Sequence, residues 1–269
     1  MPTSTPQQSC WESIEMSALI SRKIVERSAI VELNQPERGN ALSVEMVREL
    51  RYALQEVFAD QNVDTVAISG AGRNLCTGFD LAGLEDQSDG DILLRFVEIE
   101  LLLSEIWHAP IRTAAFATGR TWGAGADIFA ACDFRIAKST ATFRFPGAGF
   151  GIVLGTRRLC TRVGETTARR WIAANEEIGA GEARSAGLAT DLTERESVES
   201  WITADLPKLT VQRATLNDIY RASRPDLRDQ DLASLVRSAA APGLRDRIVA
   251  YANSARRVGA SGRRVAPDA

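Results

Sequence analysis

Two short apolar runs, each ending in a loop that contains glycine, constrain the fold of this chain more than any other feature. The segments VDTVAISG (63–70) and IRTAAFATG (111–119) are short, apolar and bounded by glycine, as buried strands are. Between them stands DILLRFVEIELLLSEIW (91–107), which is apolar nearly all round and predicts a buried helix. A strand, a helix and another strand in this order predict a mostly parallel sheet covered by helices, so the fold class is α/β.

The segments that flank these strands extend the same pattern. Residues 17–36 contain two short runs broken by polar residues, which predict a strand pair. Residues 43–60 place apolar side chains at helical spacing after Ser43, a residue type that often caps a helix N-terminus. From Gly155 onward the pattern turns helical, and this includes the segment GEARSAGLATDL (181–192).

The order of elements predicts four parts of the chain. We expect a disordered N-terminal tail at residues 1–15, an α/β core at 16–199, a helical region at 200–258 and a flexible tail at 259–269. The C-terminal end contains a cluster of arginines, which we interpret as solvated, although contact with a phosphate is the alternative. The arginines are Arg256, Arg257, Arg263 and Arg264.

Composition excludes several classes of protein. The chain has 269 residues and a formal net charge of -3, so no overall basic field indicates a nucleic-acid partner. No apolar run reaches the roughly 18 residues that cross a membrane, and the N-terminus does not resemble a signal peptide.

Four cysteines without metal-ligand spacing predict no metal site and suggest reduced thiols in a cytoplasm. They are Cys10, Cys76, Cys132 and Cys160. The only histidine, His108, is expected to pack at a helix end rather than to catalyse.

A loop follows each of the two predicted buried strands. These loops are GRNLCTGFD (72–80) and GRTWGAGAD (119–127), and ligands of parallel sheets collect at the carboxyl ends of the strands. The second loop leads into a helix predicted at DIFAAC (127–132), and the first amides of a helix lack intrahelical partners. One amide from each loop can converge on a single oxygen, which is the arrangement of an oxyanion hole.

Asp127 stands where such a site would need a proton-exchanging group. Ala124 and Asp127 are three residues apart and share a face on a helix. A carboxylate there can exchange protons with the atoms next to a held carbonyl, which suggests enolate chemistry on an acyl compound. Two other interpretations stay open. Asp127 can simply complement the helix dipole, or the loop can bind a dinucleotide, although no third glycine stands near Phe129.

Several of these segments resemble the crotonase (enoyl-CoA hydratase/isomerase) superfamily, over roughly residues 17–258. The matching segments are NQPERGNALSVEMVREL, NLCTGFDL, GRTWGAGADIFAACDFRIA and GEARSAGLATDL. The resemblance implies a ββα spiral core with a C-terminal helical trimerisation region, assembled as a homotrimer or as a hexamer of paired trimers. It also implies an acyl-CoA substrate, a place in fatty acid metabolism and no cofactor beyond the CoA moiety. We expect no nucleic-acid or membrane partner.

The resemblance assigns roles residue by residue. The oxyanion amides would be those of Phe79 and Ala124, and Asp127 takes the place of the first of two catalytic glutamates. Asp80 is expected to stabilise its loop, and Trp122 to pack rather than to contact substrate. In the related assemblies a neighbour's C-terminal helix can approach the CoA, which gives the arginine-rich tail a possible role. The residues implied to bind CoA or substrate are Arg38, Ala41, Phe79, Asp80, Leu81, Ala82 and Ala124.

The chain departs from the family pattern at the second glutamate. That position falls directly after Pro146, where this chain has Gly147. Arg144 and Phe145 beside it change the charge and bulk of the pocket, and whether Arg144 meets a substrate carboxylate stays open. Glu100 is a possible substitute acid, because its predicted helix shows no obvious cationic partner. The alternative interpretation of Glu100 is an acid at a subunit contact or in a salt bridge.

Three functions follow from these residues. The first is an enzyme of the hydratase or isomerase type (a lyase or an isomerase) that uses Asp127 as its one familiar acid/base. The second is a CoA-thioester decarboxylase or hydrolase that uses the same oxyanion hole, which the missing second acid motivates. The third is a CoA-binding protein that has lost catalysis.

Overall fold

The computed structural model describes residues 19–261 of the chain, with side chains through residue 254. Within this part, a central sheet of six strands has the order β1-β2-β3-β4-β6-β9. The first two strands are antiparallel and the later neighbours are parallel, which confirms the predicted strand pair and the α/β class. The strands are β1 (Ile20–Val25), β2 (Ser28–Leu33), β3 (Thr65–Gly70), β4 (Arg112–Ala117), β6 (Phe134–Lys138) and β9 (Asp191–Thr193).

A second, smaller sheet has the order β5-β7-β8. It consists of β5 (Arg120–Trp122), β7 (Thr142–Arg144) and β8 (Ile178–Gly179). Strand β5 lies in the loop that follows β4, so this small sheet begins at the carboxyl end of a central strand. None of its three strands was predicted. Runs of two or three residues carry too little periodicity to be recognised as strands from sequence.

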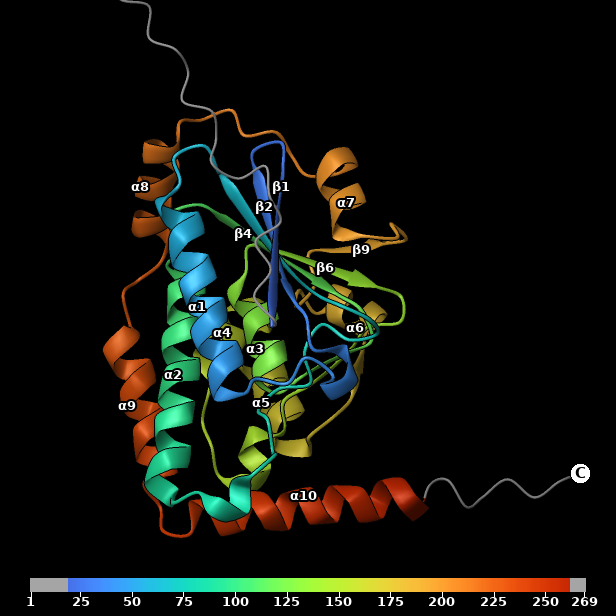
Figure 1. Ribbon diagram of the computed structural model, residues 1–269, viewed down its shortest axis with the longest axis vertical. Coiled ribbons are helices and arrows are strands. Elements are labelled where there is room, and N and C mark those ends of the chain that lie inside the picture. The colour runs from blue at the N-terminus through green and yellow to red at the C-terminus, as the bar shows by residue number, and fades with distance from the viewer. Residues whose placement is uncertain (1–18, 262–269) are drawn as a thin grey trace, which may run out of the picture.

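Helices cover both faces of the central sheet (Figure 1). The larger core lies between the sheet and helices α1, α2 and α3, and a smaller cluster packs α7 on the opposite face. The helices are α1 (Val44–Ala59), α2 (Asp89–Trp107), α3 (Ala124–Ala131), α4 (Thr156–Val163), α5 (Glu165–Ala174), α6 (Ala180–Ser185), α7 (Val198–Ala204), α8 (Arg213–Ser223), α9 (Arg228–Ala239) and α10 (Leu244–Ser261). Three short 3-10 helices are η1 (Pro36–Arg38), η2 (Leu84–Asp86) and η3 (Pro146–Phe150).

The first two long helices form where the sequence predicts them. The hydroxyl of Ser43 accepts a hydrogen bond from the Met46 amide and caps α1, as expected. The predicted core positions of α1 are all buried, namely Met46, Leu50, Ala53, Leu54 and Val57. Helix α2 begins with a capping box between Ser88 and Asp91 and ends at His108, which confirms the expected helix-end position of the histidine.

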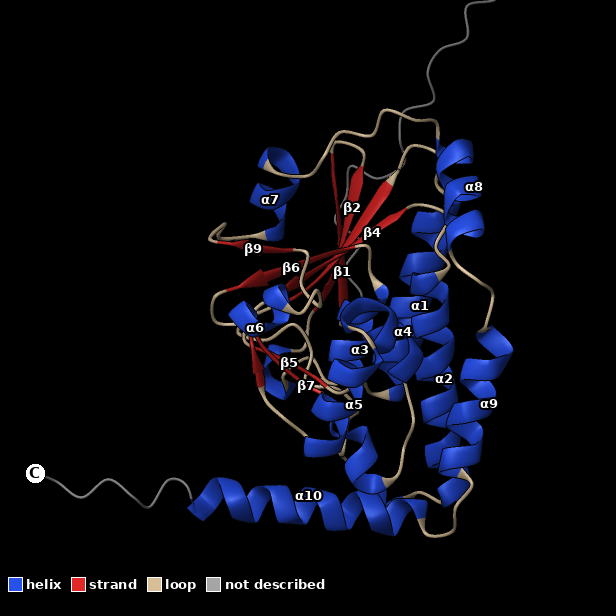
Figure 2. Cartoon of the chain, turned by 180° about the vertical axis from the view of Figure 1, so that it is seen from behind, coloured by secondary structure: helices blue, strands red, loops and turns tan. Residues whose placement is uncertain are grey.

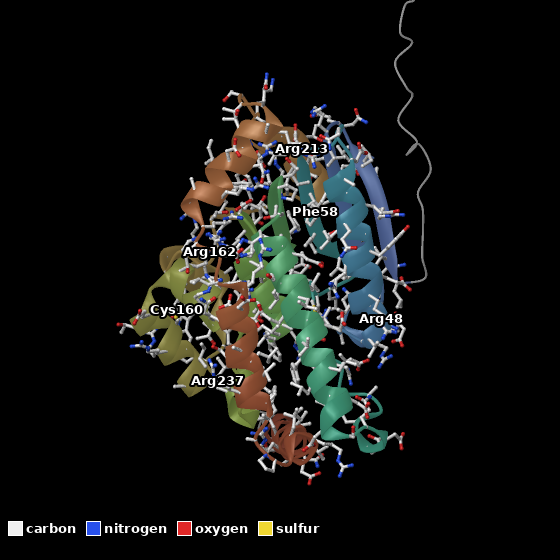
Figure 3. All side chains as sticks on the ribbon, turned by 90° about the vertical axis from the view of Figure 1, so that its left-hand side faces the viewer. Arg48, Phe58, Cys160, Arg162, Arg213 and Arg237 are labelled. Atoms are coloured by element: carbon white, nitrogen blue, oxygen red, sulfur yellow. The ribbon has the colours of Figure 1, made fainter. Side chains whose placement is uncertain are left out.

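Helices α1, α2, α9 and α8 run along one side of the molecule (Figure 3). The guanidinium of Arg213 in α8 donates to the carbonyl of Phe58, in the last turn of α1, and to that of Val63 in the loop that follows (2.7 Å). Because the last carbonyls of a helix have no intrahelical donor, the arginine satisfies an acceptor that the end of α1 leaves open. This contact fixes the predicted C-terminal helical region against the core.

The structure corrects two predicted boundaries. The segment GEARSAGLATDL is helical only in α6, and Asp191–Thr193 forms strand β9 beside β6. The helix predicted at DIFAAC begins three residues earlier, at Ala124. Strand β9 forms through its pairing with β6, which is distant in sequence and leaves no mark on the local pattern.

The predicted tails fall largely outside the described residues. Residues 1–15 and 262–269 are not described, whereas α10 extends to Ser261, past the predicted start of the C-terminal tail at residue 259. The role of residues 200–258 in trimer formation stays a prediction. No helix in the described part combines the length and apolarity that crossing a membrane requires.

Candidate active site

The two loops singled out in the sequence lie side by side. The amide of Leu75 donates to the carbonyl of Thr118 (3.0 Å), and the amide of Trp122 donates to the carbonyl of Cys76 (3.0 Å). Gly78 stands at the closest approach, with φ of 93°. A Cβ added there would lie 2.8 Å from the Trp122 carbonyl oxygen and 3.3 Å from the Ala124 amide nitrogen. Glycine is therefore required for the main chains of the two loops to touch.

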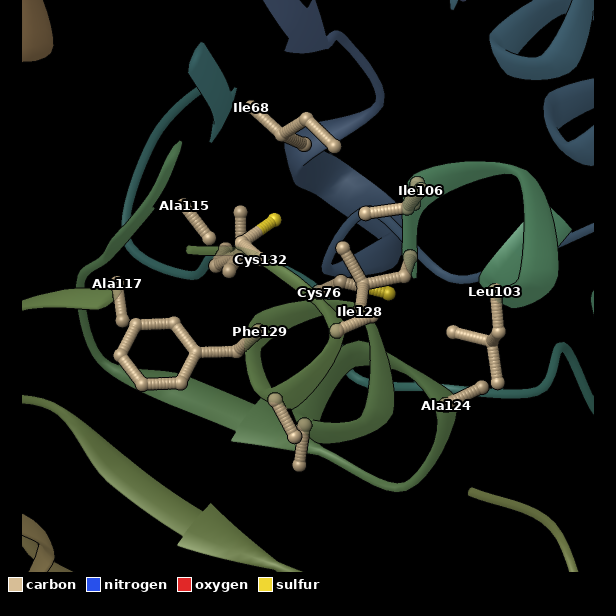
Figure 4. Close-up of a cluster of buried hydrophobic side chains, with 14 of the residues drawn as sticks. Ile68, Cys76, Leu103, Ile106, Ala115, Ala117, Ala124, Ile128, Phe129 and Cys132 are labelled. Carbon is tan, nitrogen blue, oxygen red and sulfur yellow. The ribbon is translucent and has the colours of Figure 1, made fainter. Parts of the chain in front are cut away.

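Helix α3 approaches the first loop equally closely. A Cβ added to Gly125 would lie 2.3 Å from the carbonyl oxygen of Cys76. Figure 4 shows the buried cluster beneath this contact, where Ile128 and Cys76 lie near Leu103 and Ile106 of α2. The glycines of GAGAD thus permit tight packing, which places the first turn of α3 against the loop that contains Phe79.

Two main-chain amides remain without acceptors at this contact. Within residues 19–261, neither the Phe79 amide nor the Ala124 amide donates a hydrogen bond. Ala124 is the first residue of α3, so its amide has no intrahelical acceptor, and Gly123 before it offers no capping side chain. Phe79 and Ala124 both line one cavity. Free donors at a cavity wall can bind an oxygen of a ligand.

The cavity has a volume of about 240 Å³ and a mostly apolar wall. A series of aromatic rings forms part of this wall. Phe79 stacks on Phe96 at 4.4 Å between centroids, Phe150 lies 6.3 Å from Phe96, and Tyr251 lies 5.4 Å from Phe150. Phe96 belongs to α2 and Tyr251 to α10, so segments far apart in sequence enclose the site (Figure 1).

Asp127 lies in the same cavity, one turn along α3 from Ala124. Its side chain is buried, and within the described residues its Oδ1 has no hydrogen-bond partner. Burial raises the pKa of Asp127 well above its ordinary value; the nearby Glu100 charge adds to this effect, while Arg158 opposes it. A Cβ added to Gly155, the N-cap of α4, would lie 2.1 Å from Asp127 Oδ1. The carboxyl group therefore packs directly against a glycine. Its burial is what favours the protonated form.

Within the described part of the chain, no second acid lines this cavity. Gly147 lies in η3 and lines the wall, as do its neighbours Phe145 and Pro146. Among the described side chains that line the cavity, Asp127 is the only acidic one. General acid/base chemistry in this cavity would therefore have to use one carboxyl group.

Glu100 does not replace the missing acid. Its carboxylate accepts two hydrogen bonds from Arg158, at 2.6 Å and 3.1 Å, and both side chains are almost fully buried. Glu100 does not line the cavity. The expectation that its helix offers no cationic partner was wrong, because the partner comes from α4, 58 residues away in sequence. Glu100 is a salt-bridged structural acid, which is the alternative interpretation given above.

The residues expected to bind CoA cluster around the first loop. Asp80 accepts from the Ala82 amide (3.0 Å) and from Arg38 (2.6 Å), so it stabilises the loop as predicted. Leu81 lines the cavity and is exposed at its mouth, and Ala41 is buried beside the loop. Their contact with CoA stays a prediction.

Trp122 and Arg144, both singled out in the sequence, lie in the cavity wall, and so do residues that were not predicted, among them Tyr251. Trp122 lines the cavity and donates from its indole nitrogen to Thr142 (3.1 Å). Arg144 also lines it. Tyr251 was not predicted. It follows the buried Leu244 and Ile248 of α10 at helical spacing, but this spacing does not show that the helix reaches the cavity. The arginines from Arg256 to Arg264 lie outside the side chains described, so their possible contact with a phosphate stays open.

Comparison with known proteins gives one consistent result. The sequence profile of the Enoyl-CoA hydratase/isomerase family matches residues 25–233. The probable enoyl-CoA hydratase echA6 of Mycobacterium leprae is 31% identical over 198 residues, which is 70% of this chain and 78% of that protein. The putative enoyl-CoA hydratase/isomerase YngF of Bacillus subtilis is 31% identical over 172 residues, covering 62% of this chain and 66% of that protein.

Solved structures share the fold. A structure from Bordetella parapertussis, assigned to the enoyl-CoA hydratase/isomerases, is 38% identical with a TM-score of 0.80, covering 87% of this chain and 98% of that one. A structure of an enoyl-CoA hydratase/isomerase from Xanthobacter autotrophicus has a TM-score of 0.77 over 94% of this chain and all of the other. Its identity of 24% supports the fold alone.

Proposed function

This chain belongs to the enoyl-CoA hydratase/isomerase family of enzymes, and we propose that it binds an acyl-CoA thioester through the amides of Phe79 and Ala124. The observation that carries the proposal is a pair of amides, from two loops at one cavity, that have no acceptor within residues 19–261, with a buried acid one helical turn away. No cofactor beyond the CoA moiety of the substrate enters the proposal.

The two amides would act on the thioester carbonyl oxygen. When a proton leaves or joins the neighbouring carbon atoms, negative charge develops on that oxygen as an enolate. Two fixed N–H donors in an apolar cavity stabilise this charge, and removing one such donor typically costs about 2.7–4 kcal/mol of transition-state stabilisation. Glycine at 78 and at 125 keeps both donors in place by allowing the loops to touch.

Asp127 would exchange the proton. Because burial favours its neutral form, Asp127 begins the reaction as a proton donor and becomes a base only after it has given up its proton. In a hydration, Asp127 would have to exchange protons with both the attacking water and the α-carbon, one after the other. This requirement follows from the cavity having Asp127 as its only acidic side chain among those described.

The single acidic side chain among those described at the cavity also supports a second function, decarboxylation of a CoA thioester. There the bond between the α-carbon and the carboxylate breaks, CO2 leaves, and the electron pair becomes the enolate held by the two amides. Neutral Asp127 then donates its proton to the α-carbon. This sequence needs one acid and no initial base, which suits a cavity that has Gly147 in place of a second carboxylate. Hydrolysis of the thioester would use the same donors to hold a tetrahedral oxyanion. A third possibility, a CoA-binding protein without catalysis, predicts binding alone.

The test replaces Asp127 by Asn and follows turnover of crotonyl-CoA and longer enoyl-CoA esters, with malonyl-, methylmalonyl- and saturated acyl-CoA assayed for CO2 and free thiol. We expect turnover of one ester class to fall about 10²–10⁴-fold in the variant, while calorimetric acyl-CoA affinity is retained. Unchanged turnover would remove Asp127 from the mechanism. Tight binding with no turnover of any ester would support the non-catalytic alternative, and absence of acyl-CoA binding would refute the proposal.

A further inference from the structure

The strongest feature not used by the proposed chemistry is the cation of Arg144 at the wall of the cavity. Within the described residues, no carboxylate lies within ion-pair distance of this guanidinium, although its neighbour in the small sheet, Trp122, lies 5.6 Å from it. Other arginines near the site differ. Arg158 pairs with Glu100, and Arg38 pairs with Asp80. A cation that faces an apolar cavity without an anion loses solvation that only a ligand or water can replace.

Asn175 holds the guanidinium in one orientation. Arg144 Nε donates to both the carbonyl oxygen (3.1 Å) and the side-chain Oδ1 (3.0 Å) of Asn175, a left-handed residue that ends α5. The side-chain Nδ2 of Asn175 in turn donates to the hydroxyl of Tyr251 (3.1 Å). Its two terminal nitrogens make no hydrogen bond within the described residues, and with Nε held by Asn175 they form a fork of N–H donors. Such a fork matches the two oxygens of a carboxylate.

The fork lies on the same wall as the proposed thioester site. The carbonyl of Arg144 accepts from the Gly123 amide at 2.7 Å, and Gly123 precedes Ala124 directly. The backbone of Arg144 is thus beside the second loop, while its side chain extends to Asn175, which in turn contacts the hydroxyl of Tyr251 (Figure 2 shows β7 and α5 in this region). An acyl group held at Ala124 would therefore extend along a wall that contains one unpaired cation.

We propose that the acyl group of the substrate carries a second carboxylate, which Arg144 binds through its two terminal nitrogens, so that the substrate class is a dicarboxylic acyl-CoA thioester. This inference rests on the proposed binding of an acyl-CoA. A carboxylate paired with arginine is stabilised as an anion, which opposes its loss as CO2. The bound carboxylate is therefore one that stays on the substrate, which favours hydration over decarboxylation at that group.

The experiment compares matched saturated CoA esters, which have no double bond to hydrate. Calorimetry measures the affinity of the protein for succinyl-CoA against butyryl-CoA, for glutaryl-CoA against pentanoyl-CoA, and for adipyl-CoA against hexanoyl-CoA. We expect at least one dicarboxylic ester to bind about 10-fold more tightly than its partner, and this preference to weaken with added salt. Equal affinity within every pair would overturn the inference while leaving the proposed function intact. No binding of any ester would refute the proposed function itself.

Variants assign the preference to one side chain. Arg144→Met is expected to abolish the preference and keep the affinity for the monocarboxylic esters, whereas Arg144→Lys keeps the charge without the fork and retains part of it. Arg120→Met is the matched control, because Arg120 lies over the same Trp122 ring at 4.7 Å but is exposed and does not line the cavity. A preference that survives Arg144→Met, or that Arg120→Met removes equally, would contradict the assignment. The wild-type comparison stands even where Arg144→Met does not fold.

Discussion

Two buried acids in neighbouring regions of this molecule have opposite surroundings. Glu100 in α2 is 2% exposed and receives two hydrogen bonds from Arg158. Asp127 in α3 is 5% exposed, and its Oδ1 has no partner within the described residues. Burial is the largest cause of the raised pKa of both groups, and only Glu100 has a bonded cation to offset it.

The difference separates a structural acid from one available for chemistry. A buried carboxylate with a bidentate arginine is held in one place, and its oxygens are occupied. A buried carboxyl group without a partner at a cavity wall retains a proton that it can donate to a ligand. The same cation, Arg158, acts on both, because its charge also opposes the rise of the Asp127 pKa. Three changes test this comparison, beginning with the largest expected effect.

Replacing Arg158 should destabilise the region around Glu100. Arg158→Met leaves Glu100 buried without its partner, so we expect the free energy of unfolding to fall by about 3–5 kcal/mol, measured by urea denaturation. Asp231 keeps its bonds to Arg157, at 2.8 Å and 2.5 Å, and does not lose its only cation. The double variant Glu100→Leu with Arg158→Met replaces the pair by apolar groups and should recover most of the loss. A double variant as unstable as the single one would show that the pair matters for its shape and not for its charge.

Adding a methyl group at Gly155, beside the Asp127 carboxyl group, should destabilise the fold and alter the cavity. Gly155→Ala introduces a Cβ at 2.1 Å from Asp127 Oδ1, and its φ of 65° already disfavours a side chain. We expect a loss of about 2–4 kcal/mol of stability from overpacking and backbone strain together, with lower turnover of the active ester.

Gly83→Ala is the matched control for that change. Gly83 has φ of 65° and ψ of 21°, so its left-handed backbone resembles that of Gly155, but nothing lies within 4 Å of the added Cβ. It should lose only about 1 kcal/mol of stability. Equal losses in the two variants would mean that the carboxyl group moves aside freely and is not held by Gly155.

The change in stability at neutral pH should differ in sign between variants of the two acids. The folded-state pKa of Asp127 is raised, so its contribution is fully present below the unfolded pKa of about 3.9 and is lost as pH rises towards the folded pKa. In that window wild-type stability should fall by up to about 1.4 kcal/mol per pH unit from this group, because the unfolded chain binds fewer protons. Asp127→Asn should remove this slope and be more stable than wild type at neutral pH.

Glu100→Gln provides the contrast. It leaves Arg158 buried with only Asp231 at 3.3 Å, so we expect it to be less stable than wild type at neutral pH, by about 1–3 kcal/mol. Urea denaturation between pH 4 and pH 8 measures both variants. Should Asp127→Asn be destabilised at neutral pH to the same extent as Glu100→Gln, Asp127 would be a paired structural acid, and the comparison would fail.

Much of the framework was predictable because its signals are local. The strands β3 and β4, the helix α1 with its Ser43 cap and the two loops follow from apolar periodicity and glycine placement. The position of Asp127 on the same face as Ala124 follows from helical spacing, although α3 begins earlier than predicted.

Features that join distant segments were not predictable. Strand β9 consists of three residues, and only its pairing with β6 makes it a strand. Arg158 reaches Glu100 from another helix, and Tyr251 reaches the cavity from α10. No spacing in the sequence relates these residues to one another.

The sequence by itself determined the α/β class, the two glycine-containing loops and an acid beside the second of them. Only the tertiary structure decided which buried acid is paired, which amides are left without acceptors and which cation faces the cavity. The physical reason is that periodicity and capping act within a few residues, whereas burial and charge pairing depend on which distant side chains the packed core brings together.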